Sequence, residues 1–402
     1  MKIMGPLFGY EMKKIWGRKL TWVVTATLVI ICVVDAIAPM FLNGGYEFTY
    51  TAEDGTEYSI YLTSAEQAAV LKQGADNISG RVLDEEFFRE MRRSLSAFRD
   101  DDPGLIGYLY LVDPTYAEPK AIINNVGLGL DTVTEEGFYA ARRELARASW
   151  REQELSDMEM AYWEKQGSRI EEPFTYEYTH GLTWAIGKFR DLSTLLPLAV
   201  AIGLCGVFTE ERRAKMEALI FSAKESRLPL CLSKALAGAV STALIAAAMT
   251  VGTTVACLIA FGGWGFGAAL QLYLLTSNLP IKVGCVFLMF LGLLVVYGLL
   301  YAALTMLVSA LMRSTNAALT VSFLPILGLI YLQGWVRPEG RAADYLPFNL
   351  FATGSLENGR LTELAGIQLN IFQSGFLLYL VLTAILLLLC ALVWRWNATR
   401  GS

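Results

Sequence analysis

VGCVFLMFLGLLVVYGLLYAALTMLVSAL, residues 283–311, is the longest apolar run in the chain and contains no charged residue. Runs of about 18 or more apolar residues are typical of transmembrane helices, because a helix of that length crosses the hydrocarbon core of a bilayer. The chain has 402 residues, of which 54% are hydrophobic, more than in an average soluble domain. Five further runs lie at residues 20–40, 192–208, 235–261, 317–336 and 375–394. The sequence therefore predicts an α-helical membrane protein with six transmembrane helices.

The distribution of charge predicts how these helices are oriented. Residues 41–190 hold 27 acidic and 15 basic residues, a net charge of −12; because the whole chain carries −5, the remainder carries +7. The basic residues gather near both ends and in the loop 209–234, which has six basic and four acidic residues. Basic loops stay in the cytoplasm. We therefore expect both termini inside the cell and residues 41–190 outside, which an even number of spans allows.

Residues 41–190 are long enough to fold as a domain. Alternating residues at 46–50 and 58–61, on either side of Asp54-Gly55, predict a β-hairpin. Helical patterns follow, with Ser64 and Asp84 as candidate N-caps and a candidate capping box at residues 132–135 that opens one long helix to about residue 166. We therefore expect a mainly helical (α+β) extracellular domain. It would capture a substrate or partner, or serve as a lid or dimer contact.

The six cysteines all lie outside residues 41–190. The domain must therefore hold together without disulfides, although the compartment would allow them. A bacterial plasma membrane is the simplest setting. The predicted division of the chain is an interfacial helix at 1–19, a span at 20–40, the extracellular domain at 41–190, a span at 191–208, a cytoplasmic loop at 209–234, four spans in 235–396 with an outer segment at 337–374, and a cytoplasmic tail at 397–402.

The loop 209–234 begins with an amphipathic pattern. Thr209 is a candidate helix cap, and Glu210 and Glu211 suit the positive end of a helix dipole. Met216 and Leu219, with Ile220, form an apolar stripe, and the charged residues lie off that stripe. Such a helix lies in the membrane interface with one face toward the cytosol.

A family resemblance follows from the order of residues between the second and third spans. Phe208, Glu210, Glu211 and Arg212, then Leu219, Ile220 and Ser222, then Ser226 and Arg227, and finally Lys234, Leu236, Ala237 and Gly238 resemble the permease subunits of ATP-binding-cassette exporters, and more narrowly the type-2 permease family. The family's usual Gly-Thr and Pro are replaced by Lys215-Met216 and Lys224-Glu225. The basic N-terminal segment, with Glu11-Met12-Lys13-Lys14, and the outer stretch at residues 346–349 are also similar to the family.

The resemblance implies that the loop 209–234 contains a coupling helix that docks on a separate ATP-binding subunit. It also implies a second permease copy or homologue, as a homodimer or heterodimer, with ATP and magnesium bound by the partner ATPase subunit and no cofactor in this chain. The expected partners include the lipid membrane and no nucleic acid. The residues expected to contact the ATPase subunit are Glu210, Glu211, Arg212, Arg213, Lys215, Met216, Leu219, Ser222, Ser226 and Arg227.

Few residues are candidates for chemistry in this chain itself. No G-x-x-x-x-G-K-[ST] motif is present, so ATP hydrolysis is expected on another subunit. His180 is the single histidine, and we interpret it as an interfacial residue. Paired glutamates also occur in intramembrane prenyl endopeptidases, but no predicted span supplies the histidines that such enzymes need. We therefore predict no catalytic residue and no metal site. Asp35, within the first span, is a candidate polar site in the membrane.

These observations predict the membrane-spanning permease subunit of an exporter that moves a peptide, an antimicrobial compound or a lipid-like substrate across the plasma membrane. Two other functions remain open. A membrane-anchored sensor or resistance protein would use the outer domain to bind a ligand and would need no ATPase subunit. A secondary transporter would need ionisable residues at mid-membrane, which these spans nearly lack.

Overall fold

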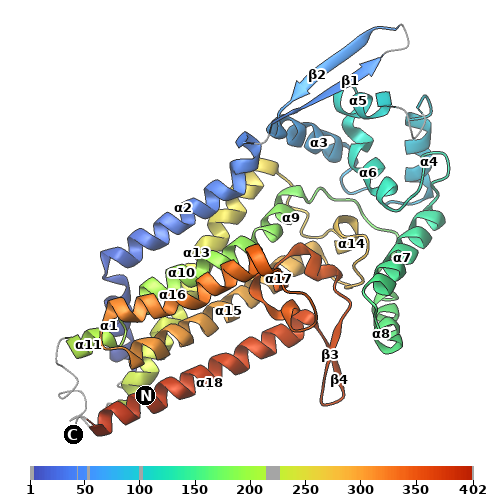
Figure 1. Cartoon of the computed structure of the whole chain (residues 1–402). Helices are drawn as coiled ribbons and strands as arrows, with labels where there is room; N and C mark the ends of the chain where they lie inside the picture. Colours follow the sequence, from blue (N-terminus) through green and yellow to red (C-terminus); the bar gives the residue numbers. More distant parts are fainter. Residues whose placement is uncertain (1–3, 43, 52–54, 99–102, 214–226, 401–402) are drawn as a thin grey trace.

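The computed structural model describes residues 4–42, 44–51, 55–98, 103–213 and 227–400. A bundle of long helices forms one part of the molecule, and a group of shorter helices and a hairpin extends from one end of it (Figure 1). We call the end that holds α1 (Met4–Trp16) and the last turns of α18 the basal end, and the opposite end the distal end. Both chain termini lie at the basal end (Figure 1).

Within the described residues, six helices are long and apolar enough to cross a membrane, which confirms the predicted number. The first lies at Lys19–Leu42 and the second at Phe189–Arg213, where α10 continues almost directly into the short helix α11. The main helices of the bundle are α2 (Lys19–Leu42), α10 (Phe189–Leu204), α13 (Arg227–Phe261), α15 (Val283–Leu311), α16 (Thr315–Tyr331) and α18 (Ile371–Arg400).

Packing explains which of these helices lie inside the bundle. Helix α10 is the most enclosed, and its side chains at Phe189, Leu196 and Val200 are fully buried. Helix α15 packs mainly against α10 and α18. By contrast, α2 and α16 keep large apolar side chains exposed, which suits faces that contact lipid or another subunit. These exposed side chains include Leu20, Trp22, Val23, Ile30, Leu324, Leu327 and Ile330.

Helix α13 begins earlier than the sequence pattern suggests. The predicted third span starts at residue 235, whereas α13 starts at Arg227 and includes Pro229 in its first turn. Proline is tolerated there because the first turn of a helix has no internal partner for its N–H groups. As a result Lys234 lies within the helix instead of at the end of a loop.

The distal end carries a second hydrophobic core, separate from that of the bundle. The predicted hairpin is present as β1 (Tyr46–Thr51) and β2 (Glu57–Leu62), paired antiparallel. Phe48 stacks on Tyr110 of α5 at 4.2 Å between ring centroids, so the hairpin packs by one face. The helices are α3 (Ser64–Ile78), α4 (Glu85–Ser94), α5 (Pro103–Leu111), η1 (Pro114–Tyr116), α6 (Ala117–Asn125), α7 (Glu135–Glu152) and α8 (Asp157–Gly167).

The predicted long helix between residues 132 and 166 is wrong, because two helices occupy this stretch. Thr134 is the N-cap of α7 and accepts a hydrogen bond from the N–H of Gly137 at 3.1 Å. Helix α7 ends at Glu152, and the backbone at Glu154 has a φ of 54°, in the left-handed region. Ser156 then begins α8 with a capping box in which Glu159 accepts from the Ser156 N–H at 2.9 Å. This second box is the signal that separates the helices.

The other caps in this region are close to those predicted. Asp84 caps α4 and accepts from the N–H of Phe87 at 2.9 Å, as predicted. The helix ends at Ser94, before Leu95 and Phe98. The cap of α3 is Thr63, one residue before the predicted Ser64, because Glu66 completes a capping box with Thr63.

Short elements join the distal part to the bundle. Helix α9 (His180–Gly187) leads into α10, and α14 (Leu270–Tyr273) lies between α13 and α15. Between α16 and α18 the chain forms η2 (Leu332–Val336), η3 (Ala343–Tyr345), α17 (Pro347–Leu350), η4 (Thr353–Glu357), β3 (Leu361–Leu364) and β4 (Ile367–Asn370). The residues after η2, 337–370, are called the distal segment below.

The distal segment is tied to helices α7 and α8. The buried Glu159 carboxylate accepts from the N–H of Leu361 at 2.9 Å and pairs with Arg341 at 3.1 Å. Trp163 donates its indole N–H to the carbonyl of Gly359 at 2.6 Å. Gln153 bonds both Gly359 and the carbonyl of Glu357. Helices far apart in the sequence are thereby held to the segment that leads into α18.

Candidate functional site

Helices α1, α11 (Thr209–Arg213) and α13 converge on a group of buried charges at the basal end. Lys234 of α13 is fully buried, and its Nζ lies 2.9 Å from Glu11 Oε1 of α1 and 2.5 Å from Glu211 Oε1 of α11. Lys14 of α1 lies 3.2 Å from the same Glu211 oxygen. We call Glu11, Lys14, Glu211 and Lys234 the basal ion cluster.

The cluster contains two carboxylates and two ammonium groups, so it is formally neutral. Neutrality matters because an unpaired buried charge is expensive, and removing one partner of a buried pair costs about 3–5 kcal/mol. Lys14 and Lys234 both donate to the carbonyl of Val207, at 3.3 and 3.1 Å. The burial of Lys14, together with the nearby Lys234 ammonium, lowers the pKa of Lys14. The cluster therefore joins the end of α10–α11 to both α1 and α13.

The cluster is only partly satisfied by hydrogen bonds. Within the described ranges, Glu11 Oε2 and Glu211 Oε2 are buried and accept no hydrogen bond. A partly satisfied polar network costs more than a complete one.

Residues on the other side of α11 connect it to α15 and α16. Arg212 donates from both guanidinium ends, to the carbonyl of Ala310 at 2.7 Å and to that of Met312 at 2.8 Å. Thr209 shares a hydroxyl hydrogen bond of 2.8 Å with Thr315 at the start of α16. Arg18 pairs with Glu210 at 2.6 Å. Thr209 and Arg212 therefore attach α11 to α16 and α15, and Glu210 attaches it to Arg18.

Four of the predicted coupling residues, Glu210, Glu211, Arg212 and Arg213, lie in α11. Glu211 and Arg212 face other helices, Glu210 pairs with Arg18, and Arg213 is exposed. Arg227 is the first residue of α13. The remaining predicted contacts, Lys215, Met216, Leu219, Ser222 and Ser226, lie outside the described residues.

Sequence reasoning missed Glu11, Lys14 and Lys234 as site residues. A signal was present for Glu11 and for Lys234. Glu11 is the one acidic residue among the first 21, in a segment otherwise basic, and Lys234 interrupts a stretch that continues as an apolar helix. Their pairing depends on how three helices meet, which a linear pattern does not report.

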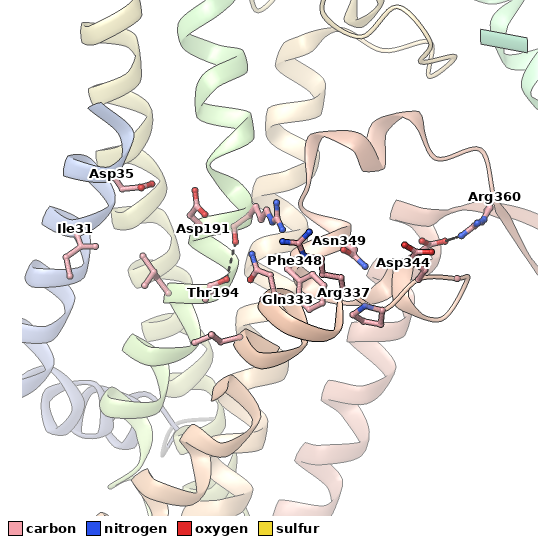
Figure 2. Close-up of a pocket in the computed structure, with 17 residues that line it drawn as sticks. Ile31, Asp35, Asp191, Thr194, Gln333, Arg337, Asp344, Phe348, Asn349 and Arg360 are labelled. Atoms are coloured by element: carbon pink, nitrogen blue, oxygen red, sulfur yellow. Dashed lines mark hydrogen bonds and ion pairs between the residues drawn. The ribbon is translucent and has the colours of Figure 1, made fainter. Parts of the chain in front are cut away.

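A cavity of about 1250 Å³ lies toward the distal end of the bundle, between α2, α10, η2 and the distal segment. Figure 2 shows Asp35 and Asp191 extending from two neighbouring helices toward the side where Gln333 and Arg337 lie. Ligand cavities of drug-sized molecules measure about 300–1000 Å³, so the space is ample for a small molecule or a lipid chain. We call it the distal cavity.

The distal cavity is lined by both charged and apolar residues. Asp35, the candidate polar residue of the first span, lines it and pairs with Lys188 at 2.8 Å. Asp344 pairs with Arg360 at 3.1 Å within the distal segment (Figure 2). The guanidinium of Arg190 lies 3.2 Å from the side-chain amide of Gln333, with the amide oxygen assigned to face it. Ile31, Leu195, Ile330 and Phe348 supply the apolar lining.

His180 lies at the start of α9 among aromatic rings. Its ring lies 6.1 Å from those of Tyr178 and Trp184, nearly parallel to both, and 5.4 Å from that of Phe261. Burial lowers the pKa of this histidine. A neutral imidazole packed in this way is consistent with the interpretation of His180 as an interfacial residue.

Comparison with known protein families gives one match, which covers nearly the whole chain. The model of a family described as ABC-2 family transporter protein matches residues 6–395. The matched range includes five of the six long helices in full, α18 as far as residue 395, the basal ion cluster and the distal cavity. A search of curated proteins finds no match.

Proposed function

The chain belongs to the ABC-2 transporter family, and from this premise we propose that it is the permease subunit of an ATP-binding-cassette exporter in a bacterial plasma membrane. Its basal end would face the cytoplasm, and its distal end would face the outside. ATP would be hydrolysed on a separate subunit, with magnesium bound there. The substrate would be a peptide, an antimicrobial compound or a lipid-like molecule.

The observation that carries the proposal is the basal ion cluster. Through Glu211 and Lys234 it joins both helices that flank residues 214–226 to the interfacial helix α1. A partner that moves this loop would move α10–α11, α13 and α1 together, because buried ion pairs resist separation. A ligand shifts an equilibrium only through differential contacts with its two states. ATP-driven closure of a docked subunit would supply those contacts.

The distal cavity suits the substrate path in this proposal. It lies between α2, α10 and η2, and the exposed apolar faces of α2 and α16 lie beside it. A second permease copy or homologue would cover these faces and enclose the cavity. The mixture of apolar lining with paired charges suits an amphiphilic substrate.

The proposal is tested by purifying the protein with an ATPase subunit encoded beside it. The double variant Met216→Glu/Leu219→Glu is expected to abolish co-purification, since it places charge on the predicted apolar stripe of the coupling helix. ATP hydrolysis by the assembled complex, measured in nanodiscs, should be lost with it.

Arg313→Glu is the matched control, because Arg313 is exposed at the basal end in the loop between α15 and α16. It should leave co-purification and hydrolysis within twofold of the unmodified complex. If no ATPase subunit binds the unmodified protein, the exporter proposal fails and the membrane-anchored sensor becomes the better hypothesis.

A further inference from the structure

A second cavity, of about 580 Å³, lies where the distal helices meet the bundle. Residues of α6, α9, α14 and η4 line it. Figure 1 shows α6, α9 and α14 near one another where the distal helices meet the bundle. We call it the junction cavity. It is distinct from the distal cavity, although Asp191 lines both.

Aromatic rings form much of the wall. Tyr176, His180, Trp184 and Tyr273 all line the space. Trp184 is held in place because its indole N–H donates to the carbonyl of Ala36 in α2 at 3.0 Å. Fixed aromatic faces bind flat apolar groups, and they also attract cations.

The charged groups of the wall are mostly acidic. Glu118, Glu177 and Asp191 line the cavity, against Lys188 as the one lysine or arginine among its lining residues. Burial raises the pKa of Glu118, although the hydroxyl of Tyr176 donates a hydrogen bond to its carboxylate. The lining therefore holds three carboxyl groups against one ammonium group.

Glu177 is the acidic lining residue for which the described residues provide no counter-ion. Within the described part of the chain, no side chain pairs with it and no group donates a hydrogen bond to it. Its carboxylate occupies room left by a glycine, because a Cβ atom on Gly267 would lie 2.7 Å from Glu177 Oε1. The local backbone thus accommodates an acidic group that has no internal counter-ion.

The protein already places one ammonium group at the edge of this cavity. Lys188 Nζ lies 2.8 Å from Asp35, 3.7 Å from Asp191 and 5.8 Å from the centroid of the Trp184 ring. Two carboxylates and an aromatic face therefore hold an alkylammonium ion here. A second cation entering beside Glu177 would meet the same kinds of group.

We propose that the junction cavity binds an organic cation, a protonated amine or quaternary nitrogen attached to a flat apolar body. Trp184 and Tyr273 would contact the apolar body, and Glu177 would pair with the charge. The inference deepens the proposed function, on which it rests for the role of the ligand as a transported substrate. Asp191 borders both cavities, so a cation bound here lies next to the distal cavity and competes with Lys188 for Asp191.

The test measures binding of ethidium, a flat permanent cation, to the full-length protein in nanodiscs without nucleotide or ATPase subunit. Saturable binding is expected from the rise in ethidium fluorescence. Glu177→Gln should weaken the affinity about tenfold, the equivalent of about 1.4 kcal/mol for one charged contact. Trp184→Leu should weaken it about threefold through loss of the cation–π contact. The uncharged parent 6-phenylphenanthridine should not displace ethidium.

Two further variants serve as controls for misfolding and for binding of ethidium outside the junction cavity. Glu171→Gln neutralises an exposed carboxylate nearby in sequence and should leave binding unchanged. Ala121→Trp adds bulk at an exposed position that lines the cavity, so it should block binding while the thermal midpoint stays within about 2 °C of the unmodified protein.

The inference is overturned if ethidium does not bind saturably, if Glu177→Gln and Ala121→Trp bind like the unmodified protein, or if the uncharged parent competes equally. Because the assay needs no ATPase subunit, its result is separate from that of the co-purification test. If the unmodified protein binds ethidium but does not co-purify with an ATPase subunit, the exporter is refuted and the cation site stays in place.

Discussion

Lys234 keeps a charged ammonium group in a fully buried position at the basal end of α13. We predict that Lys234→Met lowers the free energy of unfolding by about 3–5 kcal/mol, because Glu11 and Glu211 would then be buried with only Lys14 to balance them. The measurement is the thermal midpoint of the detergent-solubilised protein, followed by fluorescence-detected size exclusion.

A matched pair of variants separates charge balance from loss of packing. Lys13→Met changes an exposed lysine of α1 and should have little effect. Lys234→Met/Glu11→Gln removes one charge of each sign and should recover part of the loss. A double variant that is less stable than Lys234→Met alone would contradict the role of charge balance in the cluster.

His180 gives a second prediction at the scale of one residue, because it is the single histidine of the chain. Burial lowers its pKa in the folded protein below the ordinary value near 6.5. Below pH 6.5 the unfolded chain therefore binds a proton that the folded chain resists. Stability from this group is complete above pH 6.5 and is lost as the pH falls through the lowered folded pKa.

Thermal midpoints measured between pH 7.5 and 5.5 check this expectation. The unmodified protein should lose stability across that interval, and His180→Phe, which keeps an aromatic ring among Tyr178, Trp184 and Phe261, should lose less. Equal slopes for the two proteins would mean that His180 does not carry the effect.

At the scale of single elements, the sequence predicts the start of α4 correctly but misses the end of α7 and the early start of α13. Asp84 was predicted correctly as a cap because its side chain bonds the N–H three residues later. The break between α7 and α8 was missed although Ser156 and Glu159 form a capping box. Charged residues typical of an exposed helix lie on both sides of the break, so the pattern predicts one continuous helix. The residue with left-handed backbone is Glu154 and not a glycine, so the sequence gives no sign of the break there.

The attachment of α8 to the distal segment gives a prediction for this element. Glu159→Gln replaces a buried carboxylate that pairs with Arg341 and accepts from the N–H of Leu361. We expect a loss of about 1–3 kcal/mol from the local stability of residues 341–361, since hydrogen bonds to a charged group are stronger than those to a neutral one. Hydrogen exchange at Leu361 should accelerate, and exchange within α15 should not.

The pH dependence of this contact provides its control. Burial alone would raise the pKa of Glu159, but hydrogen bonds from Leu361 and Ser156 outweigh it and the pKa is lowered. The stabilisation is therefore complete above pH 4.5 and is lost as the pH falls through the lowered value. If hydrogen exchange at the Leu361 N–H is already fast at neutral pH in the unmodified protein, the hydrogen bond from Leu361 to Glu159 is not formed.

For the whole molecule, hydrophobic runs were sufficient to predict six long helices. Each run reports a local property, the need of a backbone in lipid to satisfy its own hydrogen bonds. The cavities were not predictable in the same way. The distal cavity combines Asp35, Asp191, Gln333 and Arg360, which are far apart in sequence and meet only through helix packing. Asp35 was the one lining residue marked in advance, because a charge in an apolar run stands out.

The expected orientation gives a prediction at this largest scale. A cysteine placed at Glu363, exposed on β3 at the distal end, should react with a membrane-impermeant maleimide in intact cells. A cysteine placed at Lys13, exposed on α1, should react only after the membrane is permeabilised. The protein with its six native cysteines alone supplies the background. Reaction of Lys13→Cys in intact cells would reverse the proposed orientation.

The basal ion cluster also has a consequence for the order in which the protein is made. Its four residues all lie within the first 234 of the chain, so they leave the ribosome before α15, α16 and α18. Lys234 then has its two carboxylates available as soon as α13 enters the membrane, when a lone charge would be most costly. The early helices can thus form a neutral unit that waits for the later ones, and a variant lacking Glu11 and Glu211 should be caught by cellular quality control during synthesis.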